Sequence, residues 1–235
     1  MDDPAPPGLL DALQQLDTCS VANAIETFDV RLRNEGFTDG SVHCLFPELP
    51  AVAGYAVTAR IRTSTPPPVG HVYYDRTDWW SYIATVPAPR LVVVQDIDDR
   101  PGHGAFLGEV HANILRALGC AAYLTNGAVR DLPAVRQAGL QVIAGSTIVS
   151  HGFTHMLDFG GPVTVAGLPV ASGALLLADR HGVISIPETI AAGVPSVVAD
   201  MRARERRIIE LCRAPDFSLE RLRSVIEGYR GGANR

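Results

Sequence analysis

The middle of the chain alternates short apolar runs with segments of helical periodicity, and this order limits the folds that it can adopt. Leu91–Val94 and Ala121–Thr125 are apolar runs of strand length. Between them, Glu109–Leu118 is predicted to form a helix that ends at Gly119. Its apolar stripe is predicted to comprise Leu107, Val110, Ile114 and Leu118. Strands mixed with helices in this way favour an α/β fold over a sandwich of strands.

The flanking segments supply further predicted elements. Helices are expected at 8–28 (two short ones, the second from Ser20 to Phe28), 75–85, 131–138 and 188–229, the last interrupted near 193–195 and 214–215. Strands are expected at 51–63, 141–145, 162–171, 173–178 and 183–186. Because no stretch has the composition of a linker, residues 1–235 are expected to form a single domain.

All 20 basic residues are arginine, and the chain contains no lysine. This absence excludes a Schiff-base aldolase, a lysine that anchors pyridoxal phosphate and a P-loop lysine that binds phosphate. Any chemistry that forms a carbanion next to a carbonyl group must therefore be stabilised by a metal, by arginine or by backbone amides.

The remaining composition is that of an ordinary water-soluble protein. The formal net charge of −5 disfavours a nucleic-acid-binding surface, because such surfaces are usually basic. The four cysteines lie far apart without a C-x-x-C pair, so we expect reduced thiols. The N-terminus has no apolar signal core, and no run approaches about 18 apolar residues. We therefore expect a cytoplasmic protein with no membrane or nucleic-acid partner.

A glycine-rich segment leads into the helix predicted to begin at Glu109. Residues 98–108 read DDRPGHGAFLG, and Gly108 directly precedes that helix. Free N–H groups at a helix start bind carboxylate or phosphate groups, and glycines let a ligand approach the backbone. The strand at 121–125 then leads into 126–131, which is predicted to be a polar loop of the kind that holds ligands in α/β sheets.

Together these segments supply two acids, Glu109 and Asp131, and one cation, Arg130. Arg130 can bind a substrate carboxylate through two parallel hydrogen bonds. Two carboxylates without a His or Cys cluster suit Mg²⁺ or Mn²⁺, and such a metal could polarise a 2-keto oxygen and stabilise an enolate. Each residue also has a purely structural interpretation. Glu109 could serve the helix dipole, Asp131 could be a helix N-cap, and Arg130 could belong to a surface ion pair.

Three segments carry a more specific signal: Gly108-Glu109, the GAVRD sequence of 127–131 and the ADRHGVISIP sequence of 178–187. They resemble the RraA-like family, which includes class II pyruvate aldolases of the 4-hydroxy-4-methyl-2-oxoglutarate / 4-carboxy-4-hydroxy-2-oxoadipate type. Catalytic members share an acidic residue, twenty intervening residues and Arg-Asp. Positions 110–129 supply that spacing here. The resemblance extends over roughly residues 9–210 and implies a swivelling β/β/α fold.

The resemblance implies a role for each charged residue of the site. Asp131 would bind Mg²⁺ or Mn²⁺ directly, and Glu109 would hold the metal through water. Arg130 would bind the carboxylate and keto group of the pyruvyl part of the substrate and offset the charge of the enolate. These three residues are therefore the candidate catalytic residues.

The resemblance also implies two further contributions. Backbone N–H groups near Val110 and His111, next to Gly108, would complete the pocket for the substrate carboxylate. An acid from the C-terminal region of a neighbouring subunit would join the water shell of the metal. Glu205 is the candidate and Glu210 the competing choice. Such a contribution fits the family's assembly as trimers or hexamers.

The implied function is a divalent-metal-dependent C–C lyase that cleaves small 2-keto acids by a retro-aldol reaction and releases pyruvate. Oxaloacetate decarboxylation would be a side activity, since it passes through the same enolate. Two alternatives stay open: a non-catalytic regulator of ribonuclease activity, and a lyase on the same scaffold with a different substrate. The acidic-x20-Arg-Asp pattern favours an enzyme, because the regulators of this family lack it.

Two segments, 66–90 and 146–161, match the family poorly. They contain Trp79, Trp80, His151 and His155. The tryptophans are expected in the core or at an interface, with a substrate lid as the alternative. The two histidines are four residues apart, but Gly152 disfavours a regular helix between them, so we do not expect them to bind a metal. His103 is expected to support its glycine-rich loop, and His111 to be a packing or solvent-facing residue.

Overall fold

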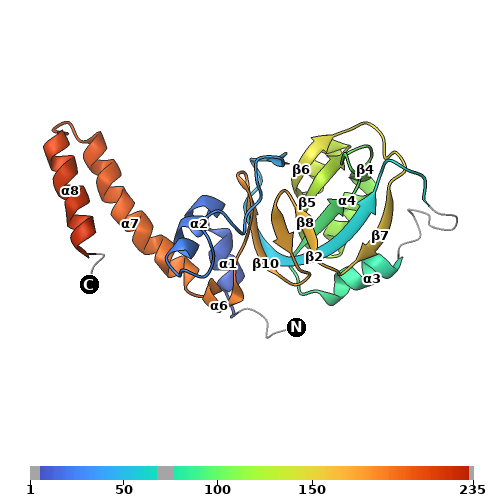
Figure 1. Ribbon diagram of the computed structural model, residues 1–235, viewed down its shortest axis with the longest axis horizontal. Helices are drawn as coiled ribbons and strands as arrows, with labels where there is room; N and C mark the ends of the chain where they lie inside the picture. Colours follow the sequence, from blue (N-terminus) through green and yellow to red (C-terminus); the bar gives the residue numbers. More distant parts are fainter. Residues whose placement is uncertain (1–5, 68–76, 233–235) are drawn as a thin grey trace.

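A mixed sheet of nine strands organises the chain in the computed structural model, which describes residues 6–67 and 77–232 (Figure 1). The helices are α1 (Leu9–Gln14), α2 (Thr18–Glu26), α3 (Thr77–Thr85), α4 (Glu109–Ala117), α5 (Leu132–Gln137), α6 (Glu188–Ala191), α7 (Val194–Arg213) and α8 (Leu219–Gly232). The strands are β1 (His43–Cys44), β2 (Val52–Arg62), β3 (Arg90–Asp96), β4 (Ala105–Leu107), β5 (Cys120–Val129), β6 (Gln141–Thr147), β7 (His155–Phe159), β8 (Val163–Val165), β9 (Leu168–Val170), β10 (Leu175–Asp179) and β11 (Gly182–Ser185).

The centre of the sheet is parallel, with the strands in the order β6-β5-β3-β2. Helices α3, α4 and α5 lie between successive strands of this set along the chain, as expected because a parallel pair needs a long crossover connection. β1, β7, β10 and β11 pair antiparallel around this centre, and β4 adds a short parallel partner to β5.

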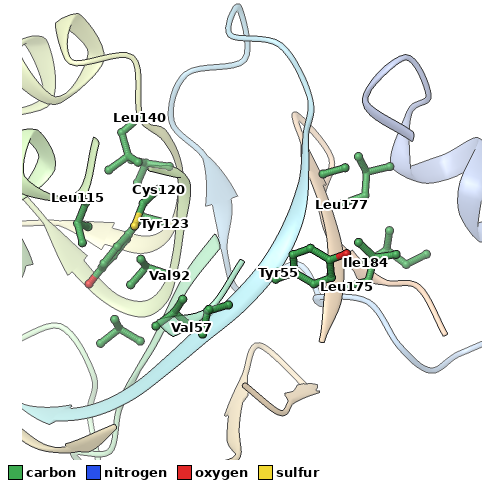
Figure 2. Packing of buried hydrophobic residues seen from close by; sticks show 14 of the residues in the cluster. Tyr55, Val57, Val92, Leu115, Cys120, Tyr123, Leu140, Leu175, Leu177 and Ile184 are labelled. Atoms are coloured by element: carbon green, nitrogen blue, oxygen red, sulfur yellow. The ribbon is translucent and has the colours of Figure 1, made fainter. Parts of the chain in front are cut away.

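The central strands are buried on both faces, which explains their nearly continuous apolar sequence. On one face, Val92 and Tyr123 belong to the same core as Leu115 of α4 (Figure 2). On the other face, Leu91 packs in a second core with Leu168 of the separate β8–β9 hairpin. The order of helices, sheet and hairpin confirms the expected α/β class and the β/β/α arrangement.

Most of the predicted elements are present, with differences of up to two residues at most ends, but β5 runs four residues and α8 three residues beyond the predicted ends. The helix predicted at 75–85 is α3, and residues 75–76 lie outside the described residues. The strand predicted at 162–171 is instead the β8–β9 hairpin, because Ala166 and Gly167 adopt positive φ values of 49° and 74° and turn the chain. Three short strands, β1, β4 and β7, were absent from the prediction.

The apolar stripe predicted for α4 is wrong. His111, Ala112 and Leu115 are its buried residues, whereas the Val110 side chain is 73% exposed. The prediction failed because it took Leu107 as the first residue of the apolar stripe and placed the later ones at helical spacing from it. This residue is the end of β4 and not part of the helix. The phase of the stripe was therefore set by a residue outside the helix.

The polar loop predicted at 126–131 is mostly strand, since β5 continues through Val129. The pairing of β5 with β6 shifts register between Thr125 and Ala128. The Asn126 side chain accepts a hydrogen bond from the Asp96 N–H at 2.8 Å and donates one to the Asp96 carbonyl at 2.9 Å. Asn126 thus ties the ends of β3 and β5 together, and the chain leaves the sheet only at residue 130.

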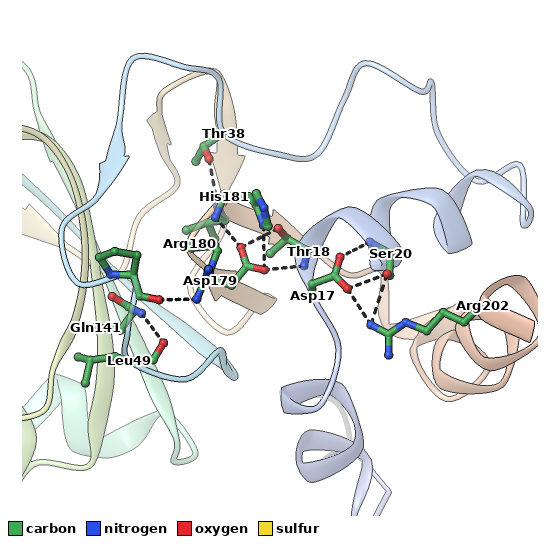
Figure 3. Close-up of polar contacts among 12 residues, drawn as sticks. Asp17, Thr18, Ser20, Thr38, Leu49, Gln141, Asp179, Arg180, His181 and Arg202 are labelled. Atoms are coloured by element: carbon green, nitrogen blue, oxygen red, sulfur yellow. Dashed lines mark hydrogen bonds and ion pairs between the residues drawn. The ribbon is translucent and has the colours of Figure 1, made fainter. Parts of the chain in front are cut away.

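Two aspartates fasten the N-terminal helices to the rest of the molecule (Figure 3). The buried Asp179 carboxylate at the end of β10 accepts hydrogen bonds from the N–H of Thr18 at 2.9 Å and from its hydroxyl at 2.8 Å. Asp17 caps α2 by accepting from the Ser20 N–H at 2.7 Å, and it also accepts from Arg202 of α7 at 2.7 Å. These contacts connect α2 to the sheet on one side and to α7 on the other.

Substituting Asp179→Ala is expected to lower the free energy of unfolding by about 3 kcal/mol, because it leaves the buried N–H and hydroxyl of Thr18 without their acceptor. Urea denaturation measures this loss. The control is Asp158→Ala, which breaks an exposed ion pair with Arg60 and should cost less than about 1 kcal/mol. Equal losses in the two variants would contradict the importance of the buried contact.

The C-terminal helices α7 and α8 pack against each other and extend away from the sheet (Figure 1). Among the described helices, none combines the length and the apolar character needed to cross a lipid bilayer.

Candidate active site

The pairing of β4 with β5 brings together two segments that are twenty residues apart. Leu107 lies opposite Val129 in this pair, and the Arg130 N–H donates to the Leu107 carbonyl at 3.0 Å. Directly after β4, Gly108 begins the turn into α4, and directly after β5 come Arg130 and Asp131. The chain between Glu109 and Arg130 therefore consists almost entirely of α4 and β5. Its length sets the spacing of twenty residues, because the paired ends of β4 and β5 bring its two ends together.

Asp131 points its carboxylate at the start of α4. Its Oδ2 accepts a hydrogen bond from the Glu109 N–H at 3.1 Å and lies 3.6 Å from Nε of Arg130. The Asp131 backbone adopts the left-handed conformation, with φ of 55°, and its side chain makes no capping hydrogen bond to α5. Asp131 is therefore the N-cap residue of α5 by position, as one interpretation of the sequence has it, but its side chain does not cap that helix. A strained backbone at such a position is typical of functional sites.

The backbone of Gly108 lies so close to the side chains of Asp131 and Arg130 that only glycine fits at this position. A Cβ atom here would lie 2.7 Å from Oδ2 of Asp131 and 3.1 Å from Nε of Arg130. The next free backbone groups are the N–H groups of Val110 and His111, which have no acceptor among the described residues. Such N–H groups at a helix start attract an anion.

These groups open into a cavity of about 460 Å³. It is lined by Trp79, Trp80, Phe106, Gly108, Glu109, Val110, His111, Ile114, Arg130 and Asp131. Six of these are the residues that the sequence assigned to catalysis or substrate binding in this subunit, and the structure places all six in one cavity. The side chains of Arg130 and Asp131 are 35% and 42% exposed, so both reach solvent or a ligand.

Apart from the alternative of a substrate lid for the two tryptophans, the sequence analysis did not predict the apolar wall of this cavity. Trp79 is buried in the core as expected, but it also lines the cavity, and so does Trp80. Phe106 and Ile114 complete the wall. The sequence did indicate that two of its residues lie together, since Val110 and Ile114 are four residues apart and so share one face of α4.

His111 is a buried neutral histidine inside the cavity wall. Its ring packs edge-on against the ring of Phe106, and its Nδ1 lies 3.2 Å from the Phe106 carbonyl oxygen. Burial lowers the pKa of His111 to about 4, because the charged imidazolium would lose its hydration. The imidazole is therefore uncharged at neutral pH and adds no positive charge to the cavity.

The buried His111 predicts a specific loss of stability in acid. Its pKa rises from about 4 to 6.5 on unfolding, so below pH 6.5 only the unfolded chain takes up this proton. The contribution of neutral His111 to the free energy of unfolding is therefore fully present above pH 6.5. As the pH falls toward 4, the free energy of unfolding decreases by up to about 3 kcal/mol. His111→Gln should remove this part of the pH dependence in urea denaturation, whereas the exposed-site control His43→Gln should not. If the free energies of unfolding of His111→Gln and wild type changed equally with pH, the assignment of this acid loss to His111 would be wrong.

The other candidate ligands make local contacts. Nδ1 of His103, His151 and His155 lies 2.7–2.8 Å from a carbonyl oxygen within three residues of each histidine. For His103 this contact agrees with the expected support of its loop, whereas His155 begins β7. All four cysteines are free thiols, as expected. Within residues 6–67 and 77–232, no three His, Cys, Asp or Glu side chains cluster in a way that could hold a metal.

Glu205 does not join the cavity of its own chain. It lies on α7, which extends from the opposite side of the molecule from α4 (Figure 1). Glu210 lies on the same helix, in a surface hollow between α7 and α8. The expected contribution of either acid to a metal therefore depends on a neighbouring subunit and stays a prediction.

Two curated proteins are similar to part of the chain. A Halalkalibacterium halodurans protein named "Putative 4-hydroxy-4-methyl-2-oxoglutarate aldolase" is 28% identical over 123 residues, which are 50% of this chain and 59% of that protein. A Hahella chejuensis protein of the same name is 30% identical over 112 residues, which are 42% of this chain and 68% of that protein. The chain thus spans less than two thirds of the first relative's length.

Solved structures share the fold over most of the chain. An uncharacterized protein from Pseudomonas syringae has a TM-score of 0.74 at 20% identity, covering 95% of this chain and 96% of that one. RraAS2 from Streptomyces coelicolor, described as an unusual member of the RNase ES inhibitor RraA protein family, has a TM-score of 0.68 at 20% identity, covering 87% and 96%. Residues 18–185 match the family model RraA-like, described as Aldolase/RraA. The chain therefore belongs to the RraA-like family.

Proposed function

We propose that this protein is a divalent-metal-dependent C–C lyase that cleaves 2-keto acids by a retro-aldol reaction and releases pyruvate. The observation that carries the proposal is the arrangement around Asp131. Its carboxylate accepts from the Glu109 N–H and lies beside the Arg130 guanidinium, at the start of α4 and inside a cavity. The aldolase names of the two curated relatives support the same reaction class.

The pyruvyl carboxylate of the substrate would bind at the start of α4. The N–H groups of Val110 and His111 have no acceptor among the described residues, and the Arg130 guanidinium lines the same cavity. Together they offer hydrogen bonds and positive charge to one carboxylate. Because Gly108 has no side chain, a ligand can approach this backbone next to Asp131.

The two acids fit a hard divalent cation. Asp131 engages Glu109 and Arg130 through Oδ2, and Oδ1 has no hydrogen-bond partner among the described residues. Asp131 would therefore hold Mg²⁺ or Mn²⁺ directly and Glu109 would hold it through water, since Mg²⁺ keeps several waters and needs one or two carboxylates. When bound, the metal supplies positive charge next to the keto oxygen. In a homotrimer or hexamer, Glu205 of a neighbouring subunit would add to the water shell.

The reaction breaks the C3–C4 bond of a 4-hydroxy-2-keto acid. The C4 hydroxyl loses its proton and becomes a carbonyl group, while the electron pair of the broken bond forms the enolate of pyruvate. Arg130 offsets the negative charge that develops on this enolate. Protonation at C3 then yields pyruvate. Oxaloacetate decarboxylation follows the same course, with carbon dioxide as the departing fragment.

Assay of the purified protein with oxaloacetate and with 4-hydroxy-2-keto acids tests the proposal. Pyruvate release should require Mg²⁺ or Mn²⁺ and should stop when EDTA is added. The absence of turnover with all of these substrates, or full turnover in EDTA, would contradict the proposal. Capture of a ribonuclease together with no turnover would instead favour the regulator.

A further inference from the structure

Two chemically different groups of residues line the cavity. The charged group is Arg130, Asp131 and Glu109, and most of the other lining residues form an apolar wall. This wall comprises Trp79, Trp80, Phe106, Val110 and Ile114. Resting on the proposed function, we propose that the half of the substrate beyond its pyruvyl group is uncharged and apolar, such as an aryl or branched alkyl group, and that the apolar wall selects it.

The charges of the cavity disfavour a second carboxylate on the substrate. Among the described lining residues, Arg130 is the one cationic side chain, and the pyruvyl carboxylate occupies it. Glu109 and Asp131 are acids, and the buried His111 ring packs against Phe106, with its Nδ1 3.2 Å from the Phe106 carbonyl oxygen. A second carboxylate would therefore lose its hydration without gaining a partner, which costs free energy.

The apolar wall is positioned as a binding surface. Val110 leaves 73% of its side chain exposed beside the cavity, although a valine in a helix of this kind normally faces the core. Ile114 lies one turn further along α4 on the same face. A cavity of about 460 Å³ that is lined mainly by apolar residues, with a few polar groups, has the size and character of a small-molecule site.

Trp79 holds the far side of this wall in place. Its ring packs on Tyr82 and Phe159, with centroid distances of 6.2 and 5.6 Å, and its side chain is almost wholly buried. Its Nε1 group nevertheless has no hydrogen-bond partner among the described residues. This N–H is closed to solvent and so is not a donor for a ligand in the cavity. Trp79 therefore contributes an apolar ring to the wall.

Two matched ligands test the inference without turnover, because both lack the 4-hydroxyl group. 2-Oxo-4-phenylbutanoate and 2-oxoglutarate share the pyruvyl part and differ in carrying a phenyl group or a carboxylate on C4. Isothermal titration calorimetry with the full chain and Mg²⁺ should show at least about tenfold tighter binding of the phenyl ligand. Ile114→Arg should reverse this preference, because it places a cation in the apolar wall. The control Ile209→Arg, on α7, should leave the preference unchanged.

The outcomes separate this inference from the proposed function. Equal binding of the two ligands, tighter binding of 2-oxoglutarate or no binding of either would overturn the inference, even if the protein cleaves keto acids. An unchanged preference in Ile114→Arg would also overturn it. A phenyl preference that Ile114→Arg reverses supports it. If the 4-hydroxy derivatives of both ligands then give no pyruvate, the proposed lyase activity fails while the selectivity of the cavity stands.

Discussion

Substituting Asp131→Asn is expected to lower kcat/KM for cleavage of 4-hydroxy-2-keto acids on the order of a thousandfold. Asparagine keeps the shape of the side chain and an oxygen for the Glu109 N–H, which Asp131 engages at 3.1 Å. It removes the negative charge that would hold the metal and that lies 3.6 Å from Nε of Arg130. A coupled assay of pyruvate release measures the loss.

The control for this variant is Asp11→Asn, the same chemical change at an exposed position of α1. It should retain wild-type activity. Thermal unfolding of both variants shows whether the fold is intact. If folded Asp131→Asn keeps more than a tenth of the wild-type kcat/KM, the assigned role of the carboxylate is wrong.

Substituting Gly108→Ala is expected to lower kcat/KM by about a hundredfold, because a small displacement of reacting groups is this costly. The new Cβ would meet Oδ2 of Asp131 at 2.7 Å and Nε of Arg130 at 3.1 Å. Both side chains must then move from their present positions beside α4. Steady-state kinetics with the same substrates measures the effect.

Gly40→Ala is the matched control for Gly108→Ala. A Cβ at position 40 has no neighbouring atom within 4 Å, so alanine should leave activity unchanged. Both variants should fold, since neither glycine has a positive φ. Wild-type kinetics in Gly108→Ala would show that Asp131 and Arg130 need not keep their observed positions.

The sequence was sufficient to predict the elements that form the parallel sheet. Leu91–Val94 and Ala121–Thr125 are apolar because the helices cover one face of their strands and the β8–β9 hairpin covers the other. The cluster of Gly108, Arg130 and Asp131 was also accessible, because the resemblance rests on their spacing. The reason for that spacing, the pairing of β4 with β5, was not accessible. β4 has three residues and lies within a glycine-rich segment whose composition indicates a loop.

Other features depend on contacts that local patterns do not encode. Asp131 precedes a helix and so reads as an N-cap, yet its left-handed backbone directs the carboxylate to α4. Val110 fits an apolar stripe but faces the cavity, because the phase of α4 is set by Ala112 and Leu115. The tryptophans reach the same cavity from α3, about thirty residues earlier in the chain, and only the tertiary fold brings them there.

The most direct test of the central claim is the exchange of the pyruvate methyl protons in D₂O, because this exchange requires the enolate that the proposed site stabilises. Proton NMR follows it with the purified protein and Mg²⁺. We expect wild-type protein to exchange the protons well above the rate in Mg²⁺ buffer, and Asp131→Asn protein to exchange them at the buffer rate. Wild-type exchange at the buffer rate, or undiminished exchange by Asp131→Asn, would contradict the account.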